Sequence, residues 1–260
     1  MTNFAGMSAE QTELQLVYGT RAVMEAVLSG KEFERVFIQQ GLNNPLLREL
    51  KGVLQDAGVH FNSVPAEKLN RMVRGNHQGV VAYLSELEYH PVDQVVSKLF
   101  QEGKTPLLLI LDRITDTRNL GAIARTAECA GVHAIVVPSR GSALLNADAI
   151  KTSAGALHHL PVCREDNLKD TIAFLKESGI RVVACSEKTE KLSWSSELTG
   201  PLAIIMGSEE NGVSPEYLKR CDGALRLPMA GSVGSYNVSV ATGMALYEVL
   251  RQRSADEGQV

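Results

Sequence analysis

The second half of the chain alternates short, almost continuous aliphatic runs with amphipathic stretches. Buried parallel strands lack the in-and-out alternation of half-exposed strands, so runs such as 107–112 and 202–206 predict strands that are covered on both faces. Further strands are expected at 134–137, 160–163, 182–184 and 224–227, and helices at 120–130, 146–156, 168–178, 215–220 and 238–253. This alternation predicts an α/β domain built on a parallel sheet.

The first part of the chain predicts a smaller α/β domain. Apolar residues recur at helical spacing within 18–30, and strands and helices then alternate up to a strand at 79–84. Polar, unpatterned residues are typical of tails, and charged residues with Pro91, Gly103 and Pro106 around a short helical pattern at 92–100 are typical of a linker. We therefore expect a disordered tail over 1–13, a first domain over 14–87, a linker over 88–105, a second domain over 106–253 and a tail over 254–260.

Two glycine-rich loops follow two of the predicted strands, Gly207–Gly212 after 202–206 and Pro228–Ser235 after 224–227. The carboxyl ends of parallel strands lie at one edge of a sheet, so both loops are expected at the same edge. Glycine lacks a Cβ atom, which lets a ligand approach the backbone closely. The pair predicts a small-molecule pocket, although glycine turns also end strands in most α/β proteins.

The loop after the first strand of the second domain disfavours the most common α/β alternative. It runs from Asp112 to Gly121 as DRITDTRNLG and lacks the G-x-G-x-x-G fingerprint of a Rossmann dehydrogenase. The chain likewise contains neither a Walker A sequence nor the G-x-S-x-G elbow of α/β-hydrolases.

Three separated patterns occur in order along the second domain: Asn119-x5-Arg125, Gly207-x-Glu209-x2-Gly212, and Pro228-Met229 followed by Ser235-Tyr-Asn237-Val-Ser. Together they resemble the three motifs of the SpoU/TrmH family, the S-adenosylmethionine-dependent RNA ribose 2′-O-methyltransferases. The resemblance runs from Leu107 to Arg253. One departure is Tyr236, where the family usually has leucine.

The resemblance implies a SPOUT-type trefoil knot in the second domain, with the last helix threaded through a loop. It also implies a homodimer whose active site is completed across the interface, and S-adenosyl-L-methionine as methyl donor without a metal. The implied catalytic residues are Arg125, Asn119, Glu209, Ser235 and Asn237. The implied cofactor-binding residues are Gly207, Leu227 and Tyr236, with Met229, Gly231 and Ser232 near enough in sequence to line the same pocket.

Each of these polar residues also has a plainer interpretation. Arg125 lies among small apolar helix positions, and a guanidinium has only donors and a pKa above ~12. Our hypothesis is that Arg125 binds the target phosphate and stabilises a developing alkoxide; the alternative is a surface arginine. Asn119 and Asn237 each precede a predicted helix and could act simply as N-caps. Glu209 could be a solvated loop carboxylate or a cap of the helix at 215–220.

The first domain carries two shorter similarities, Val17-Tyr-Gly-Thr-Arg-Ala-Val23 and His77-Gln-Gly79. They resemble the RNA-binding domain of the family branch that methylates a guanosine in large-subunit (23S) ribosomal RNA, and imply a fold of the ribosomal protein L30e/L7Ae type. Residues expected to contact RNA are Tyr18, Arg21, Arg74, Asn76, His77 and Gln78, together with Arg113 and Arg118. A transfer RNA methyltransferase of the same family and an inactive RNA-binding relative are the alternatives.

Composition limits the partners. The formal net charge of −4 argues against indiscriminate nucleic-acid binding, so any RNA-binding charge must be local. The four cysteines are widely spread and show no zinc-site spacing, which favours reduced thiols and no metal. No apolar run approaches the ~18 residues of a membrane span, and 1–11 lacks the features of a signal peptide. We therefore expect a cytoplasmic protein.

Overall fold

The computed structural model describes residues 16–85 and 87–256, and the chain divides into two units between residues 86 and 87. The predicted tail at 1–13 lies outside the described residues. Of the tail expected at 254–260, the first three residues instead extend the last helix, and 257–260 lie outside the described residues.

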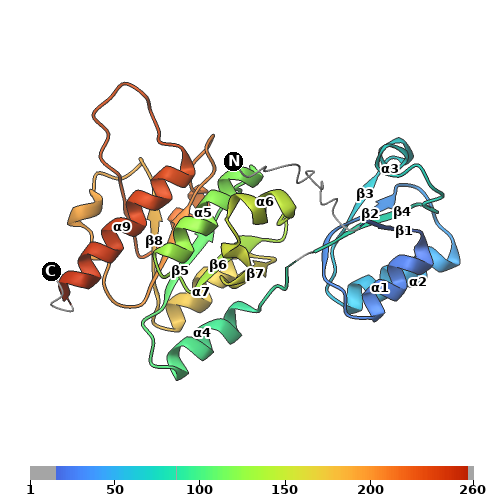
Figure 1. Ribbon diagram of the computed structural model, residues 1–260, viewed down its shortest axis with the longest axis horizontal. Helices are drawn as coiled ribbons and strands as arrows, with labels where there is room; N and C mark the ends of the chain where they lie inside the picture. The colour runs from blue at the N-terminus through green and yellow to red at the C-terminus, as the bar shows by residue number, and fades with distance from the viewer. Residues whose placement is uncertain (1–15, 86, 257–260) are drawn as a thin grey trace, which may run out of the picture. The chain divides into compact units, whose positions relative to one another are not determined.

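The first unit is a mixed four-stranded sheet with helices on both faces (Figure 1). Its elements are β1 (Leu16–Tyr18), α1 (Thr20–Leu28), β2 (Phe33–Gln39), α2 (Pro45–Asp56), β3 (Phe61–Val64), α3 (Ala66–Met72) and β4 (Val80–Leu84). The strand order is β1-β4-β2-β3, with β2 and β3 parallel and the other pairs antiparallel. One apolar cluster lies under α1 and α2, and a smaller one lies on the α3 side.

The start of the first unit differs from the expected helix over 18–30. Leu16–Tyr18 pairs with β4 as an edge strand, and α1 begins only at Thr20. Gly19 separates the two elements with a φ of 93°, a left-handed region that favours glycine. Its N–H still donates to the Val80 carbonyl at 3.0 Å, so the ladder continues through the turn.

The second unit contains an all-parallel six-stranded sheet of order β10-β8-β9-β5-β6-β7. Its strands are β5 (Leu107–Leu111), β6 (Ala134–Pro138), β7 (Val162–Glu165), β8 (Arg181–Cys185), β9 (Leu202–Met206) and β10 (Gly223–Leu225). Its helices are α4 (Val92–Gln101), α5 (Thr117–Cys129), α6 (Ala147–Thr152), α7 (Leu168–Glu177), α8 (Pro215–Leu218) and α9 (Val238–Asp256), with short 3-10 turns η1 (Ala156–His158) and η2 (Ser193–Ser195).

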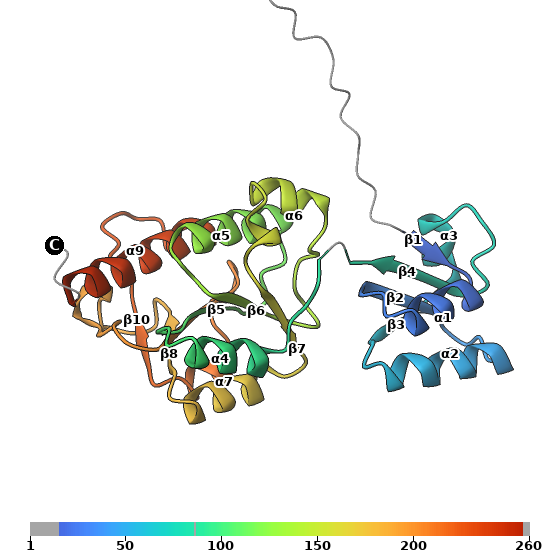
Figure 2. The same ribbon diagram turned by 60° about the horizontal axis from the view of Figure 1, so that its bottom comes forward.

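Helices cover both faces of this sheet, as the aliphatic strands predict. α5, α6 and α9 contribute to the apolar cluster on one face, and α4 and α7 to the cluster on the other (Figures 1 and 2). Every residue of β5 and β9 is buried. Burying one such aliphatic side chain stabilises the fold by roughly 1.5–3 kcal/mol, so the central strands form a rigid platform for the loops that follow them.

The expected linker over 88–105 is wrong, because this segment belongs to the second unit. Val92, Val96 and Leu99 of α4 are buried in the same cluster as β5, a spacing that places them on one helical face. Tyr89 forms a parallel bridge with Val162, the first residue of β7. Flanking charges and prolines made an amphipathic helix resemble a linker.

The single helix expected over 146–156 is interrupted. α6 ends at Thr152, and Ala154 and Gly155 have φ values of 52° and 85° before the chain resumes as η1. Two successive residues in the left-handed region cannot continue an α-helix, so the segment turns instead.

Candidate functional site

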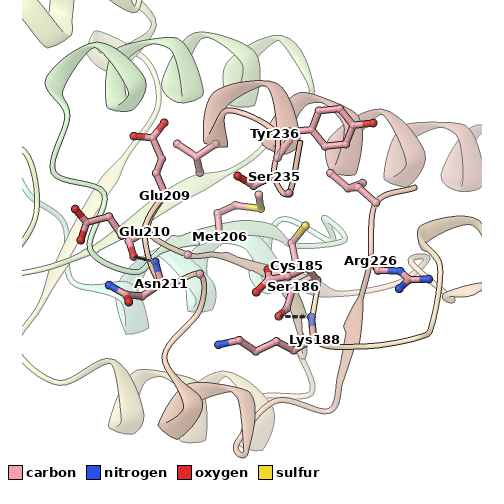
Figure 3. Close-up of a pocket in the computed structure, with 18 of the residues that line it drawn as sticks. Cys185, Ser186, Lys188, Met206, Glu209, Glu210, Asn211, Arg226, Ser235 and Tyr236 are labelled. Atoms are coloured by element: carbon pink, nitrogen blue, oxygen red, sulfur yellow. Dashed lines mark hydrogen bonds between the residues drawn. The ribbon is translucent and has the colours of Figure 1, made fainter. Parts of the chain in front are cut away.

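Three loops converge at the carboxyl edge of β8, β9 and β10 and enclose a cavity of about 530 Å³ with the first turn of α9. Figure 3 shows Glu209 and Asn211 on one side of this cavity and Arg226 on the other. Its floor includes apolar side chains such as Met206 and Ala241. A cavity of this volume, with an apolar floor and a polar rim, has the size and character of a small-molecule site.

Gly207 is required by the way its own loop folds back. A Cβ atom at this position would lie 2.0 Å from the Gly212 carbonyl carbon and 2.0 Å from the Val213 nitrogen. The loop is a tight hairpin, in which the Gly212 N–H donates to the Ser208 carbonyl at 2.8 Å and Gly212 has a φ of 64°. The two glycines are therefore needed for the loop's shape, and the tip at Glu209 is presented on that frame.

The loop from Pro228 to Tyr236 is closed by one hydrogen bond, from the Tyr236 hydroxyl to the Pro228 carbonyl at 2.8 Å. The tyrosine ring lines the cavity and is 39% exposed. The predicted cofactor residues Gly207, Leu227, Met229 and Tyr236 line the cavity, whereas Gly231 and Ser232 are not among its lining residues. Tyrosine in place of leucine therefore adds a polar contact that holds this loop shut.

Sequence reasoning missed the third wall of the cavity, the loop of Cys185, Ser186, Glu187 and Lys188 after β8. This loop contains no glycine and matches none of the three motifs. The strand order alone could have predicted this wall, because the loop after β8, a parallel neighbour of β9, lies at the same edge of the sheet as the loop after β9. Periodicity in the sequence does not give that strand order.

Glu209, Asn119 and Asn237 meet at one corner of the cavity in a triangle of hydrogen bonds. Glu209 Oε1 accepts from Asn119 Nδ2 and from Asn237 Nδ2, both at 3.0 Å. Asn237 Nδ2 also donates to Asn119 Oδ1 at 3.0 Å. Among residues 16–85 and 87–256, no donor to Glu209 Oε2 is found, so this oxygen is available to a ligand.

Asn237 has the two roles that its sequence position permits. Its Oδ1 accepts from the Ser239 N–H at 2.9 Å and the Ser239 hydroxyl at 2.6 Å, which caps the start of α9. Its amide nitrogen is thereby turned toward Glu209. Asn119, in contrast, does not cap α5: Asp116 does, accepting from the Asn119 N–H at 2.9 Å.

A second cavity of about 370 Å³ adjoins the first. The two share the tip of the Gly207–Gly212 loop and Val238, and the second is completed by Arg113–Asp116, Asn119 and Gly141. Glu209 therefore lies at the junction of two neighbouring cavities, where it can contact molecules bound in both. Ser235 lines the larger cavity.

The structure does not bring Arg125 to this corner. Six residues along α5 separate it from Asn119, which corresponds to about 9 Å along the axis and about 120° around the helix. Arg125 is exposed and is absent from the lining of both cavities. Next to it, Thr126 faces Gly243 of α9.

The residues expected to contact RNA in the first unit lie together at one end of its sheet. The would-be Cβ atom of Gly75 is 2.8 Å from the Tyr18 hydroxyl oxygen, so the Arg74–Gln78 loop packs against Tyr18. Gln78 Oε1 accepts from the Thr20 N–H at 3.3 Å. Tyr18, Arg21, Arg74, Asn76 and Gln78 are exposed, and His77 is half-buried.

His77 is engaged through both ring nitrogens. Nδ1 accepts from the Gly79 N–H at 3.0 Å, and Nε2 lies 2.9 Å from Asn70 Oδ1. These bonds assign it a structural role in holding the loop. In the second unit Arg118 is exposed, whereas Arg113 is paired with Asp112 at 2.8 Å.

The described part of the chain contains no group of three or more His, Cys, Asp or Glu side chains placed to hold a metal ion. Burial raises the pKa of the thiols of Cys163 and Cys185 to about 12. These thiols are neutral at physiological pH and are poor nucleophiles and metal ligands. In the described residues no helix is long and apolar enough to cross a membrane.

Comparisons with known proteins match both units. Residues 106–247 match the model of the SpoU rRNA Methylase family, and residues 16–90 match that of the RNA 2′-O ribose methyltransferase substrate-binding domain. The chain is 39% identical over 242 residues to the 23S rRNA (guanosine-2′-O-)-methyltransferase RlmB of Yersinia pestis, covering 92% of this chain and 98% of that protein. It is 36% identical to a putative TrmH family tRNA/rRNA methyltransferase of Bacillus subtilis, YacO, covering 92% and 96%.

Solved structures give the same picture. The SpoU methyltransferase AviRb from Streptomyces viridochromogenes, in complex with the cofactor AdoMet, superposes with a TM-score of 0.59 at 25% identity, covering 92% of this chain and 90% of that one. A TrmH/SpoU tRNA modifying enzyme of A. aeolicus superposes with a TM-score of 0.54 at 27% identity, but covers only 65% of this chain and 86% of its own.

Proposed function

Since the chain belongs to the SpoU rRNA methylase family, we propose that it transfers a methyl group from S-adenosyl-L-methionine to the ribose 2′-hydroxyl of a guanosine in 23S ribosomal RNA. The observation that carries this proposal is the position of Glu209, between two adjoining cavities and oriented by two asparagines. A transferase of this kind needs two substrates whose reacting atoms meet at one oriented polar group.

The larger cavity fits the cofactor. Its volume of about 530 Å³ lies within the range of small-molecule sites, and residues of three loops line it. Met206 and Leu227 offer apolar surface to an adenine ring, while Tyr236 holds the 228–236 loop closed. The bound cofactor supplies an electrophilic methyl group on a positively charged sulfur.

The smaller cavity is proposed to hold the target ribose, which places its 2′-hydroxyl near Glu209. Glu209 Oε2 can accept the hydrogen bond of that hydroxyl, because Oε1 already takes both amide donors. Orienting the hydroxyl in this way directs an oxygen lone pair toward the larger cavity. Ser235 lines that cavity and can bind at the same junction.

We further propose that the protein acts as a homodimer through α9. A third cavity, of about 450 Å³ and mostly apolar, opens on this helix, and the surrounding Trp194, Val240 and Tyr247 side chains are 54%, 52% and 69% exposed. Large apolar side chains gathered in one patch are typical of an interface. Arg125 directly precedes Thr126, which contacts Gly243 in the lining of this cavity. This supports a role of Arg125 in the partner's site, where it would bind the phosphate next to the target ribose.

A mixing experiment tests this arrangement. Arg125→Ala and Glu209→Gln proteins, each inactive alone, are mixed and allowed to exchange subunits. If Arg125 serves the partner's site, about one quarter of wild-type activity returns, because half of the dimers are mixed and each has one intact site. If Arg125 serves its own site, no activity returns. Tyr247→Glu, which places a charge in the apolar patch, should give a monomer by analytical ultracentrifugation.

The first unit is proposed to select the RNA. Tyr18 is exposed beside Arg21 and Arg74, which combines a surface for base stacking with charge for phosphates. Its membership in the L30e/L7Ae fold type stays part of this proposal. Tyr18→Ala should raise the KM for RNA and leave the kcat and the cofactor Kd unchanged; a fall in kcat alone would contradict an RNA-selecting role.

The trefoil knot also belongs to the proposal. It is supported by the match of residues 106–247 to the SpoU rRNA Methylase family, the resemblance that implies the knot. In single-molecule stretching, a knotted chain gains less contour length on unfolding than its residue count provides. A full gain would refute the knot. A cytoplasmic location follows from the proposed substrate.

The decisive experiment measures methyl transfer from labelled S-adenosylmethionine to protein-free ribosomal RNA and, separately, to transfer RNA. We expect 2′-O-methylguanosine in 23S RNA, identified by mass spectrometry and lost in Glu209→Gln. Label in transfer RNA would favour the alternative substrate. Cofactor binding without transfer to either RNA or to pre-ribosomal particles would favour an inactive RNA-binding relative.

A further inference from the structure

A buried carboxylate lies behind the loop that carries Glu209. Asp112 follows β5 directly, and its side chain is only 2% exposed. Its Oδ2 accepts from the Ser214 N–H at 2.7 Å, and its backbone N–H donates to the Met206 carbonyl at 2.8 Å. A buried charge destabilises a protein unless its partners compensate, so these contacts indicate a specific role for Asp112.

Arg113 supplies the compensating charge from an unusual backbone conformation. Its φ is 58°, in the left-handed region that non-glycine residues rarely occupy. Its Nε donates to Asp112 Oδ1 at 2.8 Å and its Nη2 donates to Oδ2 at 3.1 Å. In an extended strand successive side chains point to opposite faces, so a turn at Arg113 is what lets its planar fork reach the preceding carboxylate.

The same guanidinium reaches the hairpin loop from the other side. Arg113 Nη2 also donates to the Gly212 carbonyl at 3.2 Å. Gly212 and Ser214 form the base of the loop, and Glu209 lies at its tip, next to the Ser208–Gly212 bridge. The base of the loop is therefore fixed by Asp112 and Arg113, and the tip by Asn119 and Asn237.

We propose that Asp112 and Arg113 form a clamp that positions the Glu209 loop and thereby sets the rate of methyl transfer. The inference rests on the function proposed above and adds two positioning residues to it. They act through Glu209: Asp112 is buried away from both cavities, and Arg113 is held by three acceptor atoms on Asp112 and Gly212 although it also lines the smaller cavity. A loop of which only the tip was held would let the carboxylate drift from the orientation that the hydroxyl requires.

The proposal contrasts with a role of Arg113 in binding RNA, and kinetics separate the two. Arg113→Gly suits the left-handed backbone and removes the whole side chain with its guanidinium fork. We expect the kcat at saturating RNA and cofactor to fall on the order of 10- to 100-fold, because small misplacements of reacting groups have effects of this size. The KM for RNA and the cofactor Kd, measured by calorimetry, should stay within roughly threefold. Arg220, an exposed arginine just after α8, provides the control. Arg220→Ala should change none of the kcat, the KM for RNA and the cofactor Kd.

A double-mutant cycle identifies the route of the effect. If the clamp acts through Glu209, Arg113→Gly should cost little further activity in a Glu209→Asp background, which keeps a carboxylate at a shifted position and so a measurable residual rate. Equal losses in both backgrounds, or a rise confined to the KM for RNA, would overturn the proposal. Asp112→Asn gives an independent variant, which keeps the shape of the side chain and removes its charge, and should show the same coupling.

Hydrogen exchange provides a reading that does not depend on activity. The Ser214 amide, bonded to Asp112, should exchange faster in Arg113→Gly, and the tip of the loop should follow. Unchanged exchange over 208–214 would refute the clamp even if wild-type protein transferred methyl groups normally. Conversely, a wild-type protein that methylates no RNA but shows the expected exchange difference would refute the proposed function and leave the clamp standing.

Discussion

Replacing Asn237 with Asp tests the hydrogen-bond triangle with almost no change in shape. The carboxylate keeps the acceptor that caps α9 through Ser239. It cannot donate the two hydrogen bonds that Asn237 Nδ2 makes in the wild type, to Glu209 Oε1 and to Asn119 Oδ1, both at 3.0 Å. It also sets a second negative charge directly against Glu209.

The opposing energies can be estimated. Two carboxylates about 3 Å apart repel by about 1.4 kcal/mol in bulk water and by more where water is partly excluded. Each lost hydrogen bond costs about 0.5–1.5 kcal/mol, and an aspartate at a helix N-terminus returns about 0.3–1 kcal/mol. The net destabilisation at pH 8 is therefore about 1.4–4 kcal/mol. We expect methyl transfer to fall by at least tenfold as Glu209 turns away from the amide.

The pH dependence gives the sign of the effect. Two adjacent carboxylates share a proton at a higher pH than either would alone, so their pKa in the folded state exceeds that in the unfolded chain. The destabilisation is therefore present at pH 8 and is lost as the pH falls toward 5, where a shared proton restores one hydrogen bond. Thermal melts and single-turnover rates of Asn237→Asp and wild type, recorded from pH 5 to 8, measure this.

Asn44 provides the matched control, because it caps α2 by accepting from the Leu47 N–H at 2.8 Å and no acidic residue lies in the first turn of that helix. Asn44→Asp should leave the activity unchanged at every pH. If Asn237→Asp retained wild-type rates at pH 8 and matched Asn44→Asp in its pH–stability curve, the contact between Asn237 and Glu209 would not exist in solution.

Three further predictions concern the larger cavity. Gly207→Ala should lower the free energy of unfolding by more than about 2 kcal/mol and weaken cofactor binding, because the added Cβ would lie 2.0 Å from backbone atoms. Gly223→Ala is the control and should do neither, because a Cβ there meets nothing within 4 Å. Denaturant titration measures the stability of both variants, and calorimetry measures their cofactor binding. Tyr236→Phe should weaken the cofactor Kd severalfold by releasing the Pro228 carbonyl, and an unchanged Kd would contradict its role as a loop closure. At pH 8 a thiol reagent should label exposed Cys129 well before Cys185, whose pKa burial raises to about 12; equal rates by peptide mass mapping would show that the cavity wall opens.

Much of the second unit could be predicted because its strands are continuous aliphatic runs. The bounds of the strand Leu202–Met206 were predicted correctly at both ends, because a fully buried strand is a continuous apolar run and Gly207 directly follows it. Helix starts were harder. Asp116 and Asn119 are both good N-caps three residues apart, and local propensity alone does not decide between them.

The candidate site was predicted as a set of motifs but not as an arrangement. Asn119 and Glu209 are 90 residues apart, and Asn119 and Asn237 are 118 apart, so their contact depends on a strand order that periodicity does not encode. Arg125 belongs to the first motif yet lies away from this corner. The Cys185–Lys188 loop was not predicted to line the cavity, because the strand order places it there and its residue types indicate no binding site.

The order of the site along the chain also has a consequence for synthesis. Glu209 and Asn237 lie far downstream of Asn119, and α9 packs on α5 only after both have been made. At translation rates of about 5–20 residues per second, roughly 6 to 24 s separate Asn119 from its partner Asn237. The first unit, with its own apolar clusters, is complete long before that. A nascent chain therefore completes its first unit while the contact of Glu209 with Asn119 and Asn237 is still unformed.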